Sequence, residues 1–355
     1  MKRVQMCLIG LAALFVAVGS QAMFRAADLV VIPAAASTVG SSNSDWHTDL
    51  EIRNVDSVPV DVEIVLLPRS GSSNELWYDD VSNHLGGRSS DGFGHINEAL
   101  ADIQPGQVVE LPDVIRTYWG DDMTGALLVF GYEAGTLQTS TPPGGVPRLI
   151  LVDSRTYSVS TDDQGNTLTY GQEIPGLPWY DFLDSSLQAE GLDHVVFMGL
   201  REDADYRTNL GLVNVSDELT SLDVIITLTT ADGTVLATSY VPLPPLADIQ
   251  FNSFATGLFG LTSDELSQLP GSTLKVAVVG WTTGAQDPHP ALMTYLSRVD
   301  NNTNDPVYLE QTFEPELPYD CVFGSSASSS SIGARALSSG APRWHLRAPE
   351  PKAAK

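Results

Sequence analysis

The segment DNNTNDP at residues 300–306 combines residue types that could bind a cation through oxygen atoms. Asp300, Asn302 and Asn304 occupy alternate positions, and Asp305 follows directly. Calcium loops of the EF-hand type take carboxylate and amide oxygens from such alternate positions. Their sixth position requires Gly and their twelfth a bidentate Glu, whereas this chain has Asp and Gln there. We therefore expect weak calcium binding or none, and a polar hairpin held by Asx-type hydrogen bonds.

Three tryptophans stand beside carboxylates, in the segments LWYDD, TYWGDD and PWYDF. They are Trp77, Trp119 and Trp179. Aromatic rings next to acids are typical of surfaces that bind sugars, so these residues are candidates for carbohydrate binding. The alternative is burial in a core or an interface, because tryptophan is highly buried on average.

The sequence lacks the patterns of common hydrolases and zinc enzymes. It contains no G-x-S-x-G nucleophile turn, and none of its six histidines forms an H-x-x-x-H pair or another zinc spacing. Neighbouring carboxylates such as Asp79 and Asp80 would point to opposite faces on a strand, and so acidic a chain produces such pairs freely. We predict that the protein is not an enzyme and has no cofactor other than the weak calcium candidate.

The charge of the chain is strongly negative. Residues 23–324 hold 43 acidic and 11 basic side chains, a difference of −32, and the whole chain has a formal net charge of −26. A surface of this sign repels phosphate backbones, which argues against nucleic-acid binding. Two explanations remain, a saline habitat in which salt screens the carboxylates or divalent-cation binding by some of them.

The chain begins with a pattern typical of a secretory signal peptide. Met1-Lys2-Arg3 precede an apolar run, and small residues lead to a cleavage site that we place after Ala22. No later segment has about 20 consecutive apolar residues, so we expect no membrane insertion after the signal is removed. The predicted location is secreted or extracytoplasmic. Cys321 is then the single cysteine, so no internal disulfide is expected, and pairing between chains stays open.

Residues 324–355 differ in composition from the rest of the chain. They are rich in Ser, Ala and Pro and carry five basic residues against Glu350. This composition lacks the apolar content for a core, so we expect a disordered basic tail.

One ten-residue pattern occurs twice and indicates how the chain is organised. WHTDLEIRNV at residues 46–55 and YRTNLGLVNV at residues 206–215 match in residue type at most positions. Read as strands, they place a leucine in the core, a threonine with a satisfied hydroxyl and an asparagine that closes a turn by bonding the backbone. The repeated residues are Thr48, Leu50 and Asn54 in the first copy and Thr208, Leu210 and Asn214 in the second.

Six segments recur in the same order on either side of the middle of the chain, with turn residues between them. VPVDVEIVLLP and SLDVIITLTTADG alternate apolar and polar residues, as half-buried strands do. PDVIRTYWG and the capping pattern Thr262 to Glu265 suggest short helical connections. We predict an all-β chain of two tandem antiparallel Ig-like β-sandwich domains. The expected parts are repeat 1 at 28–175 with an insertion at about 71–101, a packed linker at 176–191 and repeat 2 at 192–318.

These segments also carry a family resemblance. YRTNLGLVNV followed by YLSRVDNNTNDPVYL, and WHTDLEIRNV followed by DSRTYSVSTDDQGNTLTYGQEIPG, resemble an uncharacterised family of secreted bacterial tandem β-sandwich repeat proteins. The resemblance covers about residues 28–310. It implies a non-catalytic extracytoplasmic module and carries over no catalytic residue.

The sequence as a whole predicts a secreted, non-catalytic structural, adhesive or interaction protein of the bacterial cell exterior. Its expected partner is an extracellular protein or a polysaccharide. The alternative is a carbohydrate-binding module, which could depend on calcium.

Overall fold

The computed structural model of the protein describes most of the chain between residues 25 and 313. The predicted signal peptide at 1–22, most of the expected insertion at 71–101, Cys321 and the expected tail at 324–355 lie outside the described residues. The described ranges are 25–40, 44–70, 77–78, 100–136, 145–161, 164–184, 193–216, 219–284 and 289–313.

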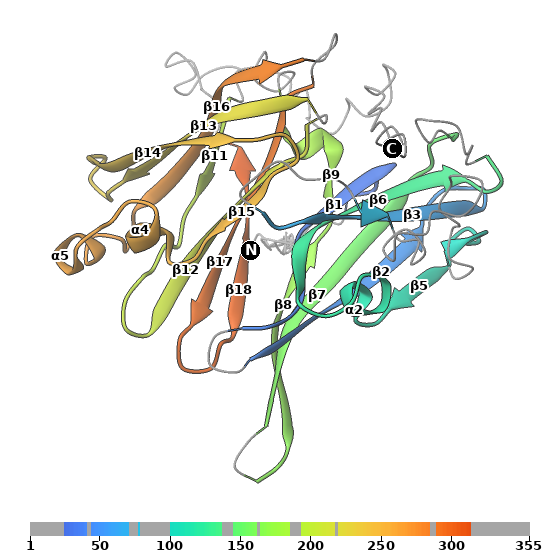
Figure 1. Ribbon diagram of the computed structural model, residues 1–355, viewed down its shortest axis with the longest axis horizontal. Coiled ribbons are helices and arrows are strands. Elements are labelled where there is room, and N and C mark those ends of the chain that lie inside the picture. Colours follow the sequence, from blue (N-terminus) through green and yellow to red (C-terminus); the bar gives the residue numbers. More distant parts are fainter. Residues whose placement is uncertain are drawn as a thin grey trace, which may run out of the picture.

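The first half of the described chain is built from antiparallel strands around one core (Figure 1). On one side β2 pairs with β5 and β7, and β7 pairs with β8. On the other side β3 pairs with β4 and β6. β1 joins the two sides, because its start pairs with β6 and its end with β2. The strands are β1 (Leu29–Val39), β2 (Asp45–Asn54), β3 (Val60–Pro68), β4 (Trp77–Tyr78), β5 (Val108–Leu111), β6 (Met123–Glu133), β7 (Ile150–Thr161) and β8 (Thr167–Pro175).

The second half pairs its strands in the same order. The sheet order β14-β13-β16-β11 corresponds to β4-β3-β6-β1, and β12 pairs with β15 and β17 as β2 pairs with β5 and β7. All ladders between named strands are antiparallel, which confirms the all-β class. The strands are β11 (His194–Phe197), β12 (Tyr206–Asn214), β13 (Thr220–Thr229), β14 (Val235–Leu243), β15 (Asp248–Phe251), β16 (Thr273–Thr283), β17 (Ala291–Asp300), β18 (Pro306–Glu310) and β19 (Thr312–Phe313).

Short helices follow corresponding strands in the two halves. α2 (Val114–Tyr118) follows β5, and α4 (Phe254–Gly257) follows β15. The residue before each helix has a left-handed backbone, with φ 47° at Asp113 and φ 49° at Ser253. α5 (Ser263–Leu266) starts with the predicted capping box, in which the Thr262 N–H donates to Glu265 Oε2 at 2.8 Å. The short helical connections predicted from the sequence are therefore confirmed.

The repeated asparagines hold equivalent turns in the two halves. Asn54 Oδ1 accepts from the Asp56 N–H at 2.8 Å, and Asn214 Oδ1 accepts from the Ser216 N–H at 3.0 Å. The Asn54 amide donates to the carbonyl oxygens of Val58 and Ile103, at 2.8 and 2.7 Å. The Asn214 amide likewise donates to backbone carbonyls of neighbouring turns. Both side chains are fully buried and close turns as the sequence predicted.

The repeated threonines and the residues after them also make matching bonds. Thr48 Oγ1 donates to the Ala36 carbonyl at 3.2 Å, and Thr208 Oγ1 donates to the Arg201 carbonyl at 2.6 Å. At the next position, Asp49 Oδ1 and Asn209 Oδ1 each accept from the N–H that precedes a helix, that of Asp113 and that of Ser253. The repeated pattern therefore encodes three ties between one strand and its neighbours.

Each half has its own hydrophobic core between its two sheets. Leu50 and Ile52 of β2 pack against Ile64, Leu66 and other residues of β3 and β6. Leu210 and Leu212 take the equivalent places in the second core. Leu50 and Leu210 are both fully buried, as the alternation along these strands predicted.

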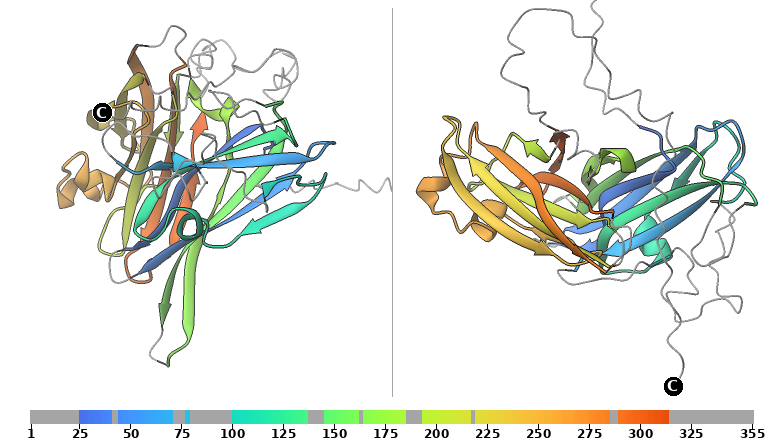
Figure 2. Two further views of the ribbon diagram at one scale, coloured as in Figure 1. Left: turned by 45° about the vertical axis from the view of Figure 1, so that its right-hand side comes forward. Right: turned by 90° about the horizontal axis from the view of Figure 1, so that it is seen from above.

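A third core joins the halves. It contains Val65 and Leu67 of β3, Leu128 of β6, and Met293 and Tyr295 of β17. Figure 2 shows the two halves side by side when the molecule is seen from above. The expectation that the segment 58–68 forms a half-buried strand is therefore wrong. β3 is buried along both faces, with only Glu63 and Pro68 partly exposed, because its second face packs on the other half. β13 keeps the predicted alternation of buried and partly exposed residues.

The segment between the halves is packed against both of them. β9 (Leu177–Pro178) pairs with β1, and β10 (Leu183–Asp184) pairs with β17. Between them lies the short helix η3 (Trp179–Asp181). Arg25 forms ion pairs with Asp181 of this segment and with Glu310 of the second half. Residues 177–184 of the expected linker therefore contact strands of both halves. No helix among the described residues is long and apolar enough to cross a membrane.

Candidate functional site

The calcium candidate at 300–305 is a tight turn between β17 and β18. Asp300 Oδ1 accepts hydrogen bonds from the N–H groups of Asn302, at 2.7 Å, and Thr303, at 2.9 Å. These N–H groups lower the pKa of Asp300, Thr303 having the larger effect. Asn304 adopts a left-handed backbone with φ 60°, which closes the turn. The Asx-type hydrogen bonds expected from the sequence are present.

A guanidinium group lies beside the amide oxygens of this turn. Arg207 of β12 donates to Asn301 Oδ1 at 2.8 Å and to Asn304 Oδ1 at 3.3 Å. A cation bound here would therefore face an arginine that already uses one of the candidate oxygens. Among the described residues, no group of three or more His, Cys, Asp or Glu side chains is placed to hold a metal ion. The arrangement is better suited to holding a turn than to binding calcium.

We predict that calcium binds this loop weakly or not at all. Calcium needs about six to eight oxygen ligands, whereas Asp300 and Asn304 are bonded within the protein. Calorimetric titration of the secreted chain should give no saturable heat in the micromolar range, and calcium should leave the melting temperature unchanged. Asp300→Ala and Asp305→Ala serve as matched variants. Micromolar affinity that either variant abolishes would contradict this prediction.

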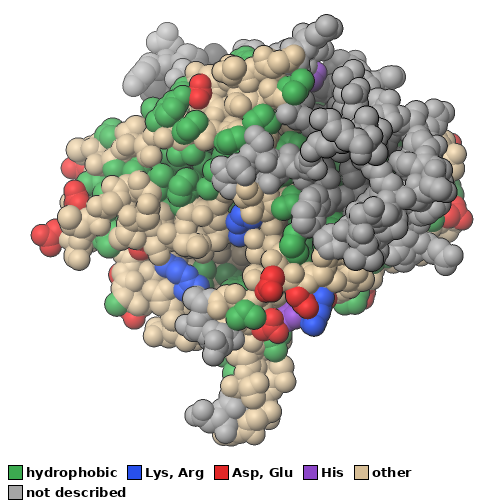
Figure 3. All heavy atoms as spheres, viewed as in Figure 1, with side chains coloured by type: hydrophobic (Ala, Val, Ile, Leu, Met, Phe, Trp, Pro, Cys, Tyr) green, Lys and Arg blue, Asp and Glu red, His purple; other side chains and the backbone are tan. Residues whose placement is uncertain are grey.

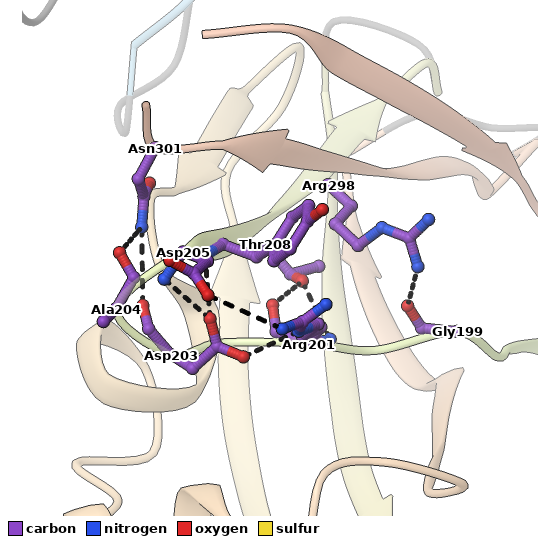
Figure 4. Close-up of polar contacts among 9 residues, drawn as sticks. Gly199, Arg201, Asp203, Ala204, Asp205, Thr208, Arg298 and Asn301 are labelled. Carbon is purple, nitrogen blue, oxygen red and sulfur yellow. Dashed lines mark hydrogen bonds and ion pairs between the residues drawn. The ribbon is translucent and has the colours of Figure 1, made fainter. Parts of the chain in front are cut away.

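The loop before β12 contributes an aromatic and charged cluster next to the same turn (Figure 4). The Arg201 guanidinium lies 4.0 Å from the centre of the Tyr206 ring, and that of Arg298 lies 6.0 Å from it. Arg201 Nε donates to Asp203 Oδ2 at 2.6 Å, and Arg298 donates to the Gly199 carbonyl at 3.0 Å. The arginines here balance nearby carboxylates and bind loop backbone.

The Asn301 amide ties the two loops of this end together. It donates to the Ala204 carbonyl at 3.2 Å and to the Asp203 carbonyl at 3.4 Å (Figure 4). Sequence reasoning grouped Asp300 to Asp305 by spacing and missed this loop, which lies almost 100 residues earlier. The sequence signal for it was REDADYR, in which two arginines flank three carboxylates at the start of the repeated pattern.

The three candidate tryptophans do not form one surface. Trp119 is 1% exposed and belongs to the first core, so its assignment to a sugar-binding surface is wrong. Its ring packs among apolar residues that a ligand does not reach. Trp179 is half-buried beside the linker, where its Nε1 donates to Asp28 Oδ1 at 2.8 Å. Trp77 lies in β4, and its side chain is outside the described part of the structure.

His47 lies in the repeated pattern, and sequence reasoning assigned it no role. Its Nδ1 is 3.0 Å from Asp113 Oδ2, and its Nε2 is 3.2 Å from Asp45 Oδ2. The ring also stacks on Tyr157, whose hydroxyl donates to Asp49 Oδ1 at 3.3 Å. Both ring nitrogens therefore face carboxylates, and the imidazole links β2 to the residue before α2.

A polar cluster is enclosed where the halves meet. Arg69, at the end of β3, donates to the Tyr295 hydroxyl at 3.1 Å, and that hydroxyl donates to Gln250 Oε1 at 2.8 Å. Arg69 Nε lies 3.6 Å from Asp248 Oδ1, too far for a hydrogen bond. The Tyr295 ring also lies over Gly211, where a Cβ atom would come within 1.9 Å of it. Only glycine fits below this ring.

Asp248 is the residue of this cluster whose ionised side chain is least stabilised by its surroundings. Its side chain is fully buried, and neither carboxylate oxygen has a hydrogen-bond donor among the described residues. Burial raises its pKa to about 6, although Arg69 acts in the opposite direction. Burial likewise raises the pKa of the Tyr295 hydroxyl. The cluster joins the halves at an electrostatic cost.

Comparisons with known proteins name no relative: no protein-family model matches the chain, and no curated protein matches it significantly. The resemblance to secreted β-sandwich repeat proteins therefore stays a prediction.

Proposed function

We propose that the chain is a secreted, non-catalytic structural, adhesive or interaction protein of the bacterial cell exterior. In this proposal two tandem Ig-like β-sandwich domains act as one rigid unit. The observation that carries it is the use made of the repeated polar side chains. Thr48, Asn54, Thr208 and Asn214 all direct their hydrogen bonds to the protein's own backbone. Repeated side chains that bond the protein's own backbone stabilise its fold, which supports a structural role for the protein.

Two further observations support a rigid pair of tandem domains. The order of strand pairing in one half recurs in the other. The halves share a buried apolar core, and the Ser70 N–H of one donates to the Asp248 carbonyl of the other at 2.9 Å. A shared core of this kind resists the hinge motion that is the usual expectation for linked domains.

The alternative, a carbohydrate-binding module, has less support from the structure than from the sequence. It relied on three tryptophans, and Trp119 lies in the core. Trp179 remains a candidate with a partly buried ring, and its Nε1 already bonds Asp28.

Location and binding test the proposal together. Sequencing the N-terminus of the protein from native culture medium should give a chain that begins at Met23. The labelled secreted chain should bind saturably to isolated cell envelopes or to another extracellular protein of the same culture. Retention in the cytoplasm with an uncleaved N-terminus would overturn the proposal. Specific binding on a glycan array that Trp179→Ala abolishes would favour the carbohydrate alternative.

A further inference from the structure

β14 is an edge strand of the second half. Within the described residues it pairs with β13 alone, in eight residue pairs from Thr229↔Val235 to Leu222↔Leu243. Alternate backbone N–H and C=O groups of an edge strand point away from its one neighbour. The equivalent position of the first half is taken by β4, which spans only Trp77–Tyr78. Among the described residues, the second half therefore has the longer edge strand on this side.

This edge lacks the charges that usually protect one. No charged residue occurs between Gly233 and Ala247, in a chain whose formal net charge is −26. Proteins commonly block exposed edges with charged side chains, proline or bulges, since an unprotected edge pairs with other strands. A register irregularity at Leu236 and a proline at position 242 interrupt the two ends of β14, and the part from Ala237 to Val241 between them pairs regularly and is free of proline.

Exposed apolar side chains lie on and beside the edge. Val235 is 58% exposed and Tyr240 is 57% exposed, and Val279 of β16 is also 57% exposed. Tyr240 pairs across the ladder with Ile225 of β13, which is partly exposed. Figure 3 shows hydrophobic side chains gathered on the side of the molecule that carries β13, β14 and β16. The strand thus offers backbone groups and apolar contact together.

We propose that β14 is a dimerisation edge, at which two copies of the chain pair their β14 strands antiparallel about a two-fold axis. Antiparallel pairing of a strand with its own copy is isologous, so each free backbone group meets an equivalent partner. Charge favours a second copy at this place. Two chains of charge −26 repel each other over most of their surfaces, whereas β14 carries no charged side chain of its own, and the nearby Asp223 carboxylate of β13 accepts a hydrogen bond from the Tyr240 hydroxyl.

The oligomeric state of the secreted full chain tests this surface. Sedimentation equilibrium from about 1 to about 100 µM protein should show a monomer–dimer equilibrium. The dimer should be favoured in about 1 M sodium chloride, where the Debye length falls to about 3 Å. Thr238→Lys puts a charge on the exposed outer face of β14. We expect it to weaken the dimer at least about tenfold, since like charges face each other across the axis.

Thr282→Lys is the matched control, because Thr282 is exposed on β16, which lies on the other side of β13 from β14. It adds the same charge and should leave the dimer intact. Hydrogen exchange should slow in β14 as the protein concentration rises. A monomer throughout this range, or a dimer insensitive to Thr238→Lys, would overturn the proposal. Protection of β14 that is independent of concentration would also overturn it, and would assign the edge to another part of the same chain.

Discussion

Replacing Asn214 with alanine is expected to lower the free energy of unfolding by about 3 to 5 kcal/mol. The side chain is fully buried, and its amide donates to the carbonyls of Thr220, at 2.9 Å, and Pro244, at 2.8 Å. Its Oδ1 accepts from the Ser216 N–H. Alanine would leave these buried groups unpaired, and each such group costs about 1–3 kcal/mol. The melting temperature should fall by roughly 6 to 20 °C.

Asn54→Ala should have a similar effect, since Asn54 makes the equivalent bonds in the first half. Because the halves share a core, each variant should lower one cooperative transition. Asn214→Asp retains the acceptor for Ser216 and replaces the amide donor by oxygen. It should destabilise as much as alanine does, which separates the lost bonds from lost volume.

Asn252→Ala is the control for these variants. Asn252 is exposed, and its Oδ1 accepts only from the Gln250 amide at 2.7 Å. Its loss should change the free energy of unfolding by less than about 0.5 kcal/mol. Thermal and urea unfolding are measured for the natural protein and for all four variants. A loss below about 1 kcal/mol for both Asn54→Ala and Asn214→Ala would contradict a structural role for the repeated asparagines.

The protein should become less stable as the pH rises from about 4 to about 7. Four carboxyl groups have pKa values that burial raises: that of Glu63 to about 7, and those of Asp153, Asp181 and Asp248 to about 6. A carboxyl group whose folded pKa exceeds its unfolded value binds its proton more tightly in the folded protein. Its contribution to stability is complete below about pH 4 and is lost as the pH passes the folded pKa.

Asp248 should account for a large part of this loss. Its pKa rises from 3.8 to about 6, and one pKa unit corresponds to about 1.4 kcal/mol, so its contribution is on the order of 3 kcal/mol. Asp248→Asn should therefore be more stable than the natural protein near pH 7 and should have a smaller pH dependence. Arg69 keeps its hydrogen bond to the Tyr295 hydroxyl in this variant.

Urea unfolding between about pH 4.5 and about pH 7.5, in about 1 M sodium chloride, measures this effect while salt screens the surface carboxylates. Asp264→Asn is the control, since Asp264 is an exposed carboxylate on α5. It should leave the pH dependence as it is in the natural protein. If Asp248→Asn also leaves the pH dependence of stability unchanged, burial does not raise the pKa of this carboxyl group as its surroundings indicate.

The recurrence of the strands along the chain and the turns closed by the repeated asparagines were readable from local sequence. The pattern around Asn54 recurs at Asn214 because each copy must satisfy the same buried carbonyls at the same turn. Alternation along 220–229 predicted which face of β13 is buried. The helix start at Thr262 was also predictable, because the donor and the acceptor of its capping box lie within one turn. In the capping box, and in the bonds of Asn54 to Asp56 and of Asn214 to Ser216, the interacting groups are close in sequence.

The candidate site was harder to predict because its parts come from distant segments. The spacing of Asp300, Asn302 and Asn304 suggested a candidate cation loop, and the sequence predicted that Asx-type hydrogen bonds hold this loop. The arginine that donates to Asn301 Oδ1 and to the candidate oxygen of Asn304 is Arg207, almost 100 residues earlier. Trp119 read as a surface aromatic because it precedes two acids, whereas its ring packs in the first core.

The sequence by itself determined the all-β class, the antiparallel strands, the short helices and the role of the repeated asparagines. Only the tertiary structure decided which sheet faces meet between the halves. β3 and β13 occupy equivalent places, yet β3 is buried on both faces and β13 on one. A strand's pattern encodes the face turned to its own core. Burial of the other face depends on a sheet more than 100 residues away, here β12 and β17, whose side chains remove it from water.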